Sequence, residues 1–349
     1  MALFESGRVS GKGVRIIVFG YHTIGYLCLR ELLARGEEVV AVVTHRDDPG
    51  EEIWFESVAE LARPSGIAVF QPRNPNTPRF TDLVRSLRPD LLLSFYYRRL
   101  LSRELLAIPR LGGINLHGSL LPKYRGRSPA NWALINGETR TGVTLHYMTE
   151  EADAGDIIAQ QAVAITAEDT ALTLFRRLAP AALELLRTTF PLIKAGHAPR
   201  TPQDPRQATL YGGRRPEDGK IDWRRPALGL YNLIRAVTAP YPGAFTCYHG
   251  RKLYVWRARP ISPRPPAATP ALFPGETGDG VGKGTRDAGV PPLPGTVLGV
   301  QEGGFLVASG GDPLLLTLVQ LQGEQPLPGD VFASSHGLAM GTQLGENER

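Results

Sequence analysis

Short apolar runs alternate with helical patterns through the first half of the chain, and this alternation restricts the possible folds more than any other feature of the sequence. Residues 14–20 (VRIIVFG) form a β-branched run that ends in glycine, and residues 24–35 then carry apolar side chains at helical spacing. Further apolar runs at 38–44 and 89–95 each follow a helical pattern. Strands that alternate with helices predict an α/β domain with a Rossmann-like parallel sheet and right-handed crossovers.

The second half of the chain has a different pattern. A long amphipathic pattern at 170–195 is expected to close the first domain, and the polar, proline-bearing stretch 197–205 is expected to be a linker. Beyond it, strand-like runs such as GAFTCYHG, KLYVWRARP and LLLTLVQL are separated by Gly, Pro and Asp, which is typical of a small β-barrel or sandwich. We therefore expect a Rossmann-like domain at 14–198 and a smaller, OB-like β-barrel domain at 206–340.

Length and composition support two domains and exclude several classes of protein. A chain of 349 residues exceeds the size at which a single hydrophobic core usually stops growing. Eight Pro and six Gly among the 33 residues of 262–294 predict a disordered insertion. The two cysteines, Cys28 and Cys247, have neither zinc nor redox spacing, so we expect no metal site and no disulfide framework.

The sequence shows neither a targeting signal nor a membrane-spanning segment. Its N-terminus lacks the apolar stretch of a signal peptide, and no run approaches the roughly 18 to 20 apolar residues that span a bilayer. We expect a soluble cytoplasmic protein without a membrane partner. The net charge is +5, but the basic residues are scattered, so charge alone leaves open an anionic small substrate, a folate glutamate tail or RNA.

The glycine turn after the first expected strand argues against a bound dinucleotide. Residues 20–25 (GYHTIG) lack the middle glycine that lets a backbone approach a pyrophosphate. Gly20 and Gly25 are therefore expected only to make the tight turn and the close contact between helix and strand.

Three polar side chains are candidates for chemistry at one centre. Asn115 and His117 alternate on the expected strand INLHG, so both leave the same face of the sheet, roughly 7 Å apart. A carboxamide and an imidazole aimed at one carbonyl group suit acyl transfer, in which an oxyanion must be stabilised while a proton moves. The segment EADAGDII places Asp153 in a turn, from which it can orient His117 or take a proton from an attacking amine. A structural histidine and a turn-capping Asp are the simpler alternatives.

The motifs INLHGSLLPKYRGRSP and TGVTLHYMTEEADAGDIIAQ, in this order, resemble the folate-dependent formyltransferase family. The resemblance implies a catalytic triad of Asn115, His117 and Asp153, with 10-formyltetrahydrofolate as co-substrate and no metal. It implies that a neutral amine attacks the formyl carbon while Asn115 and a protonated His117 stabilise the oxyanion and Asp153 assists proton removal. It also implies that the folate carrier contacts a set of residues near these motifs: Arg99, Leu100, Leu101, Arg127, Thr149, Glu150, Glu151 and Ala152.

Within this family, the residues are most similar to the formyltransferase domain of the bifunctional polymyxin-resistance proteins. SFYYRRLL, HGSLLPKYRGRSPANWALINGET and IRAVTAPYPGAFTCYHGRKLYVW carry this likeness, which implies UDP-4-amino-4-deoxy-L-arabinose as acceptor, lipid A modification and antibiotic resistance. Arg127 stands where tRNA-directed members usually have a small residue, so a nucleotide-linked amino sugar is favoured over nucleic acid. Methionyl-tRNA formylation remains the first alternative, followed by hydrolysis of formyl-folate and by an inactive nucleotide-sugar binding protein. A homo-oligomer stays open.

Overall fold

The computed structural model describes residues 13–261 and 292–345, which fall into two compact units. The first unit comprises the described residues of Met1–Leu134 and Glu138–Arg214, and the second comprises those of Ile135–Gly137 and Arg215–Arg349. The domain boundaries expected from the sequence, 14–198 and 206–340, remain predictions. Most of the expected insertion at 262–294 lies outside the described residues.

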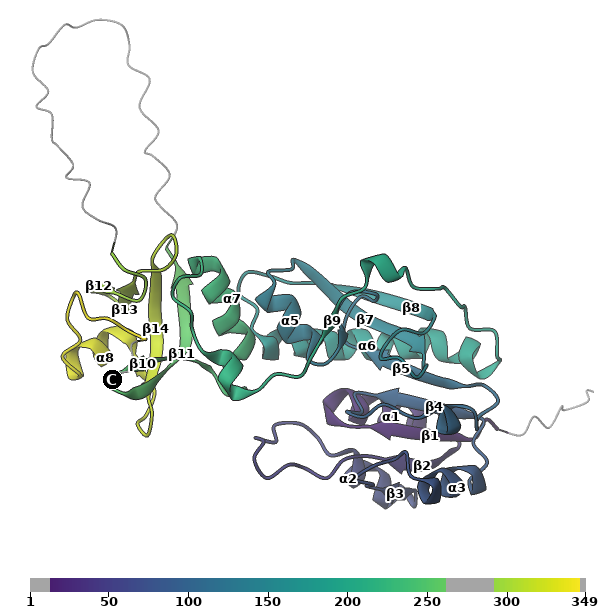
Figure 1. The fold of residues 1–349 in the computed structure, drawn as a ribbon. Helices are drawn as coiled ribbons and strands as arrows, with labels where there is room; N and C mark the ends of the chain where they lie inside the picture. Colours follow the sequence, from purple (N-terminus) through teal and green to yellow (C-terminus); the bar gives the residue numbers. More distant parts are fainter. Residues whose placement is uncertain (1–12, 262–291, 346–349) are drawn as a thin grey trace, which may run out of the picture. The chain divides into compact units, whose positions relative to one another are not determined.

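The first unit is built on a mixed sheet in which seven described strands follow the order β3-β2-β1-β4-β5-β7-β8 (Figure 1). The first five strands in this order are parallel, whereas β7 runs antiparallel to β5 and β8 antiparallel to β7. The expected parallel α/β sheet is therefore confirmed, with an antiparallel extension at one edge. The strands are β1 (Ile16–Gly20), β2 (Val39–Val43), β3 (Ala68–Phe70), β4 (Leu91–Phe95), β5 (Gly113–His117), β7 (Arg140–Tyr147) and β8 (Ile157–Ala164).

Helices cover both faces of this sheet. On one face, α1 packs against α6, and α6 also contacts β7 and β8. On the other face, one core cluster joins residues of β1, β2 and β4 to residues of α3, α4 and the loop before α4: Ile17, Phe19, Ala41, Val43, Leu92, Phe80, Val84, Leu105 and Leu101. The helices of this unit are α1 (His22–Ala34), α2 (Val58–Ala62), α3 (Pro78–Ser86), α4 (Arg103–Leu106), α5 (Pro129–Ile135) and α6 (Ala171–Lys194).

Two local predictions are confirmed in atomic detail. Gly25 lies so close to the turn that a Cβ there would sit 3.1 Å from both the Gly20 carbonyl carbon and the Phe95 carbonyl oxygen, so a side chain at this position would push the helix and the strand apart. The long helix expected at 170–195 begins after Thr170, whose hydroxyl accepts the backbone N–H of Thr173 at 3.3 Å. This capping box defines the start of the helix.

The second unit is mainly antiparallel. Its described strands pair in the order β10-β11-β14-β13-β12, with β15 beside β14; an OB-like closed barrel remains a prediction. Its elements are α7 (Ala227–Val237), β10 (Ala244–Tyr248), β11 (Arg251–Pro260), β12 (Val297–Gln301), β13 (Gly304–Val307), β14 (Leu314–Leu321), β15 (Leu327–Pro328) and α8 (Gly329–Ser335).

None of the helices within residues 13–261 and 292–345 has the length and apolar character that a membrane span requires.

Candidate active site

Two neighbouring strands place three polar side chains on one face of the sheet. Asn115 on β5 is paired in register with His146 on β7, and His117 is paired with Thr144. Because paired residues in adjacent strands share a face, the side chains of Asn115, His117 and His146 all project from the face that also carries Leu92. This is the face of the core cluster, so the polar group lies at the end of an apolar layer that excludes water around His117 and His146, which are 6% and 2% exposed.

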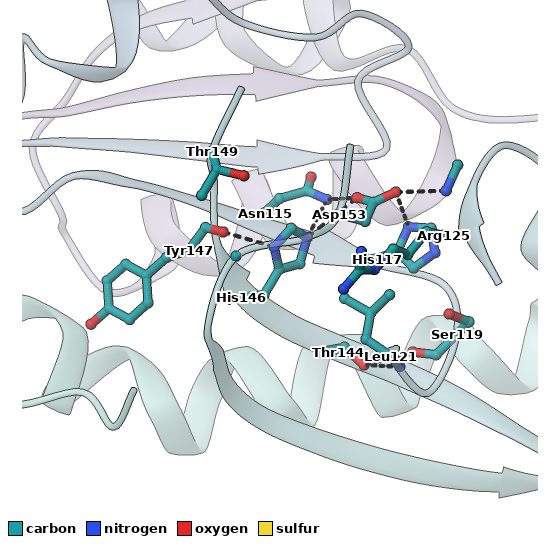
Figure 2. Close-up of polar contacts among 12 residues, drawn as sticks. Asn115, His117, Ser119, Leu121, Arg125, Thr144, His146, Tyr147, Thr149 and Asp153 are labelled. Atoms are coloured by element: carbon teal, nitrogen blue, oxygen red, sulfur yellow. Dashed lines mark hydrogen bonds and ion pairs between the residues drawn. The ribbon is translucent and has the colours of Figure 1, made fainter. Parts of the chain in front are cut away.

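Asp153 reaches the same point from the turn between β7 and β8, as Figure 2 shows. Its Oδ1 lies 3.3 Å from the Asn115 amide nitrogen and 3.3 Å from His146 Nε2. Its Oδ2 lies 3.5 Å from His117 Nδ1 and accepts the backbone N–H of Gly126 at 2.8 Å. The structure thus brings Asn115, His117 and Asp153, all expected from the sequence, into one contact network.

The proton positions of the two histidines follow from their neighbours. His117 Nε2 lies 2.7 Å from the Tyr124 carbonyl oxygen and His146 Nδ1 lies 2.9 Å from the Tyr147 carbonyl oxygen. A carbonyl oxygen only accepts, so each of these nitrogens carries hydrogen. His146 Nε2 is then free to accept an N–H of Asn115, whose amide nitrogen is 3.0 Å away.

Burial and charge set the protonation of the central pair. Burial lowers the pKa of His117 and outweighs the opposite effects of the Asp153 carboxylate and the Tyr124 carbonyl. Burial alone would raise the pKa of Asp153, but the imidazoles of His117 and His146 and the Gly126 N–H hold it below its usual range. The lowered pKa of His117 favours a neutral imidazole near neutral pH, whereas the sequence-based expectation was a protonated His117.

The loop between β5 and α5 closes over this pair through backbone in the left-handed region. Tyr124, Gly126 and Ser128 have φ values of 60°, 94° and 54°, and Asp153 itself has a φ of 53°. A Cβ at Gly126 would lie 2.2 Å from the Tyr211 carbonyl oxygen, so no side chain fits there. Non-glycine residues in this region persist only where their surroundings hold them, and here they aim the Tyr124 carbonyl and the Gly126 N–H at His117 and Asp153.

The residues expected to hold the folate carrier lie in two segments beside this network. One follows β4: Arg99 and Leu100 are exposed, Leu100 by 58%, whereas Leu101 is only 5% exposed and belongs to the core cluster. The other is the turn that contains Asp153, in which the Thr149 hydroxyl donates to the Glu151 carbonyl at 3.0 Å. Arg103, two residues beyond the first segment, has its Nε 3.9 Å from Glu150 Oε1 of the second. Arg127 lies near the first segment, donating to the Arg98 carbonyl at 3.1 Å.

Sequence reasoning missed His146. Its signal was available in TGVTLHY, where His146 alternates with Thr144 on a run expected to be a strand. What the sequence could not give was the pairing of β7 with β5, which sets His146 opposite Asn115. Within 13–261 and 292–345, no group of three or more His, Cys, Asp or Glu side chains is arranged to hold a metal ion.

Comparison with solved structures shows where this fold has been seen. A sugar 3N-formyltransferase, WlaRD, determined with dTDP and 5-N-formyl-THF, matches with a TM-score of 0.62 and 18% identity over 90% of this chain and 100% of that chain. An N-formyltransferase from Helicobacter canadensis, in complex with folinic acid and dTDP-3-aminofucose, gives a TM-score of 0.63 and 18% identity over 87% and 99%. HypX from Aquifex aeolicus, in complex with tetrahydrofolic acid, gives 0.58 and 17% over 94% of this chain and 48% of that chain.

Sequence identities this low show only that the fold is shared, whereas matches to family models show which family the chain belongs to. The formyl transferase model matches residues 14–189, just over half of the chain, and includes every residue of the Asn115, His117 and Asp153 network. The model of the formyl transferase C-terminal domain matches residues 214–337. With both domain models in their expected order around this site, the chain belongs to the formyl transferase family.

Proposed function

We propose that this protein transfers the formyl group of 10-formyltetrahydrofolate to the primary amine of a nucleotide-linked amino sugar. The observation that carries the proposal is the contact network of Asn115, His117 and Asp153, in which a carboxamide and an imidazole each lie within 3.5 Å of a buried carboxylate. Formyl transfer to an amine needs a donor for the developing oxyanion and an acceptor for the amine proton. The network contains both.

The proton acceptor is the His117–Asp153 pair. When the amine attacks the formyl carbon, nitrogen becomes positively charged and must lose a proton. His117 Nδ1 can take that proton, and the resulting imidazolium donates to the Tyr124 carbonyl through Nε2 and faces the Asp153 carboxylate through Nδ1. A neutral resting imidazole suits this role, because only the unprotonated ring accepts a proton.

Asn115 is the proposed oxyanion donor. Its amide nitrogen is held at 3.0 Å by His146 Nε2 and at a longer 3.3 Å by Asp153 Oδ1. The longer contact is the weaker one, so this N–H can turn to the formyl oxygen as negative charge develops there. His146 keeps the carboxamide in place through the shorter contact.

The formyl-folate supplies the formyl carbon at the oxidation level of the product, so no redox step is needed. Residues of this chain fit such a ligand. Neither Arg99 nor Arg127 pairs with a carboxylate in the part of the chain that the structure describes, and the exposed Leu100 offers an apolar contact for a flat ring. Burial and then the charges of Arg98, Arg99 and Arg127 lower the pKa of His45 to about 4, which places these cations together. Arg98 is paired with Glu51, so Arg99 and Arg127 are the cations that would attract the carboxylates of a glutamate tail.

The acceptor is proposed to be UDP-4-amino-4-deoxy-L-arabinose, which would place the protein in lipid A modification in the cytoplasm. The sequence likeness described above supports this amino sugar, and two of the similar structures contain dTDP or a dTDP-linked amino sugar. A pocket of about 250 Å³, lined among others by Tyr21, His45 and Phe55, opens beside β2. Strand β2 lies three places from β5 in the sheet, about 14 Å at strand spacing. A nucleotide-linked sugar can bridge such a distance, whereas a free amino sugar cannot.

The test is release of tetrahydrofolate from 10-formyltetrahydrofolate with one acceptor at a time. The acceptors are UDP-4-amino-4-deoxy-L-arabinose, a dTDP-4-amino sugar, methionyl initiator tRNA and buffer alone, and Asn115→Ala serves as the inactive control. Turnover that depends on the UDP sugar supports the full proposal, and turnover with the dTDP sugar changes only the acceptor. Turnover with tRNA would identify the protein as a tRNA formyltransferase, and turnover in buffer alone would identify it as a formyl-folate hydrolase. No turnover with any acceptor would favour a binding protein.

A further inference from the structure

The segment between α6 and the second unit, of which residues 197–205 were expected to be only a linker, is bonded to the loop over His117. Within it, β9 (Leu210–Tyr211) pairs in parallel with β6 (Arg125–Gly126). The Thr209 hydroxyl accepts the Tyr124 backbone N–H at 2.8 Å, and the Thr209 carbonyl accepts that of Arg125 at 2.8 Å. The segment therefore fixes the strand that presents the Tyr124 carbonyl and the Gly126 N–H to the site.

One side chain of this segment, Gln203, joins that strand to the turn of Asp153. Its amide nitrogen donates to the carbonyl oxygens of Asp153 and Gly155, both at 2.7 Å. Its amide oxygen accepts from Arg125 Nε at 3.1 Å and from Arg125 Nη2 at 2.8 Å. Both N–H groups and the oxygen of the Gln203 amide thus take part in hydrogen bonds. The N–H groups bond to the turn that carries Asp153, and the oxygen bonds to Arg125, the neighbour of Gly126, whose N–H contacts the Asp153 carboxylate.

The position of Asp153 needs such support. Its φ of 53° lies in the left-handed region, where non-glycine residues cost free energy unless neighbouring groups hold them. Its carboxylate must stay within reach of the Gly126 N–H, which belongs to a different segment. Gln203 bonds the Asp153 carbonyl on one side and the neighbour of Gly126 on the other, so it fixes the relative position of these two groups.

We propose that Gln203 is a positioning residue for the reaction, which holds the Asp153 carboxylate against His117 without touching the reacting atoms. This inference rests on the proposed function for its kinetic consequence, but its structural consequence can be measured separately. A misplacement of a catalytic group by about 1 Å can lower a rate on the order of a hundredfold. Loss of Gln203 should therefore reduce kcat and leave the binding of the formyl donor nearly unchanged.

Two substitutions separate the two halves of the Gln203 amide. Gln203→Met keeps the length of the side chain and removes every hydrogen bond. Gln203→Glu keeps an oxygen for Arg125 but cannot donate to the carbonyls of Asp153 and Gly155. Gln207→Met is the matched control, because Gln207 lies in the same segment and is exposed, and its side chain bonds among the described residues only to Asp204, at 3.2 Å.

Both Gln203 variants should lose about 10- to 100-fold in kcat, with KM for the formyl donor within about twofold of the parent protein; Gln207→Met should match the parent. The activity-independent readout is NMR titration of the Asp153 carboxyl group in Gln203→Met. The charged or titratable groups around this carboxyl are His117 and His146, and its other partners are Asn115 and the Gly126 N–H. As the carboxyl moves away from them, its pKa should rise from its depressed value.

The outcomes are distinct. An unchanged Asp153 titration in folded Gln203→Met overturns the inference, whatever the activity. Parent-like kcat in Gln203→Glu also overturns it, because the contact with Arg125 alone would then be sufficient. If the parent protein formylates none of the acceptors, the proposed function fails, but a shifted Asp153 titration would still support the positioning role. Thermal unfolding of each variant shows that it is folded at the assay temperature.

Discussion

Replacing Asp153 with Asn tests whether the carboxylate stabilises a proton on His117. The substitution keeps the size of the side chain and an oxygen that can accept the Gly126 N–H, but it removes the charge 3.5 Å from His117 Nδ1. At that separation, the attraction between a carboxylate and an imidazolium is about 5 kcal/mol for an effective dielectric constant of about 20. The Asp153 side chain is only 13% exposed, so screening by solvent is small.

The charge pair exists only after the proton reaches His117, so its loss raises the barrier and not the energy of the resting protein. Each 1.36 kcal/mol added to the activation free energy lowers the rate about tenfold. A loss of about 5 kcal/mol in the transition state should therefore reduce kcat of Asp153→Asn by about a thousandfold or more. The assay is release of tetrahydrofolate under saturating donor and acceptor, with circular dichroism to show that the variant is folded. A folded Asp153→Asn protein within tenfold of the parent kcat would refute this role of the carboxylate.

Three further predictions concern the same network. Asn115→Ala should lower kcat by about a hundredfold or more, as expected for one oxyanion donor, and parent-like turnover in the folded variant would exclude that role. The lowered pKa of His117 predicts that log kcat stays level near neutral pH and falls only when the pH drops below the ordinary histidine pKa of about 6.5. The reason is that His117 must be unprotonated to act as the base. A rate that rises as the pH drops through this range would contradict this role. Gly126→Ala should lower both Tm and kcat, since its Cβ would lie 2.2 Å from the Tyr211 carbonyl oxygen at a φ of 94°, whereas a Tm equal to that of the parent would show that the loop relaxes.

The parts of the site that follow from local sequence rules could be predicted. Asn115 and His117 are two residues apart on a strand, so strand geometry alone puts them on one face. Asp153 was a candidate from its place in a turn, and the likeness of the surrounding motifs to formyltransferases favoured it over a turn-capping role. The structure brings Asp153 to them across 38 residues of chain, as that likeness implied.

The parts that depend on contacts between distant segments could not be predicted. The apolar pattern of a strand does not determine whether the strand runs parallel or antiparallel to its neighbour. The sequence therefore did not predict that β7 is antiparallel to β5, or that His146 pairs with Asn115. Gln203 sits in a polar, proline-bearing stretch that resembles any linker, and its function depends on carbonyl groups 48 and 50 residues away. The lowered pKa of His117 also could not be predicted, because it follows from burial, which the sequence does not give.

The most direct test of the central claim follows the formyl group itself. We would supply 10-formyltetrahydrofolate with an isotopically labelled formyl carbon, together with UDP-4-amino-4-deoxy-L-arabinose, and examine the product by NMR. The account predicts that the label appears as a formamide on the amino nitrogen of the sugar, at a rate that Asp153→Asn lowers by about a thousandfold. Label recovered only as free formate, or an unmodified sugar under conditions in which the donor is consumed, would contradict it.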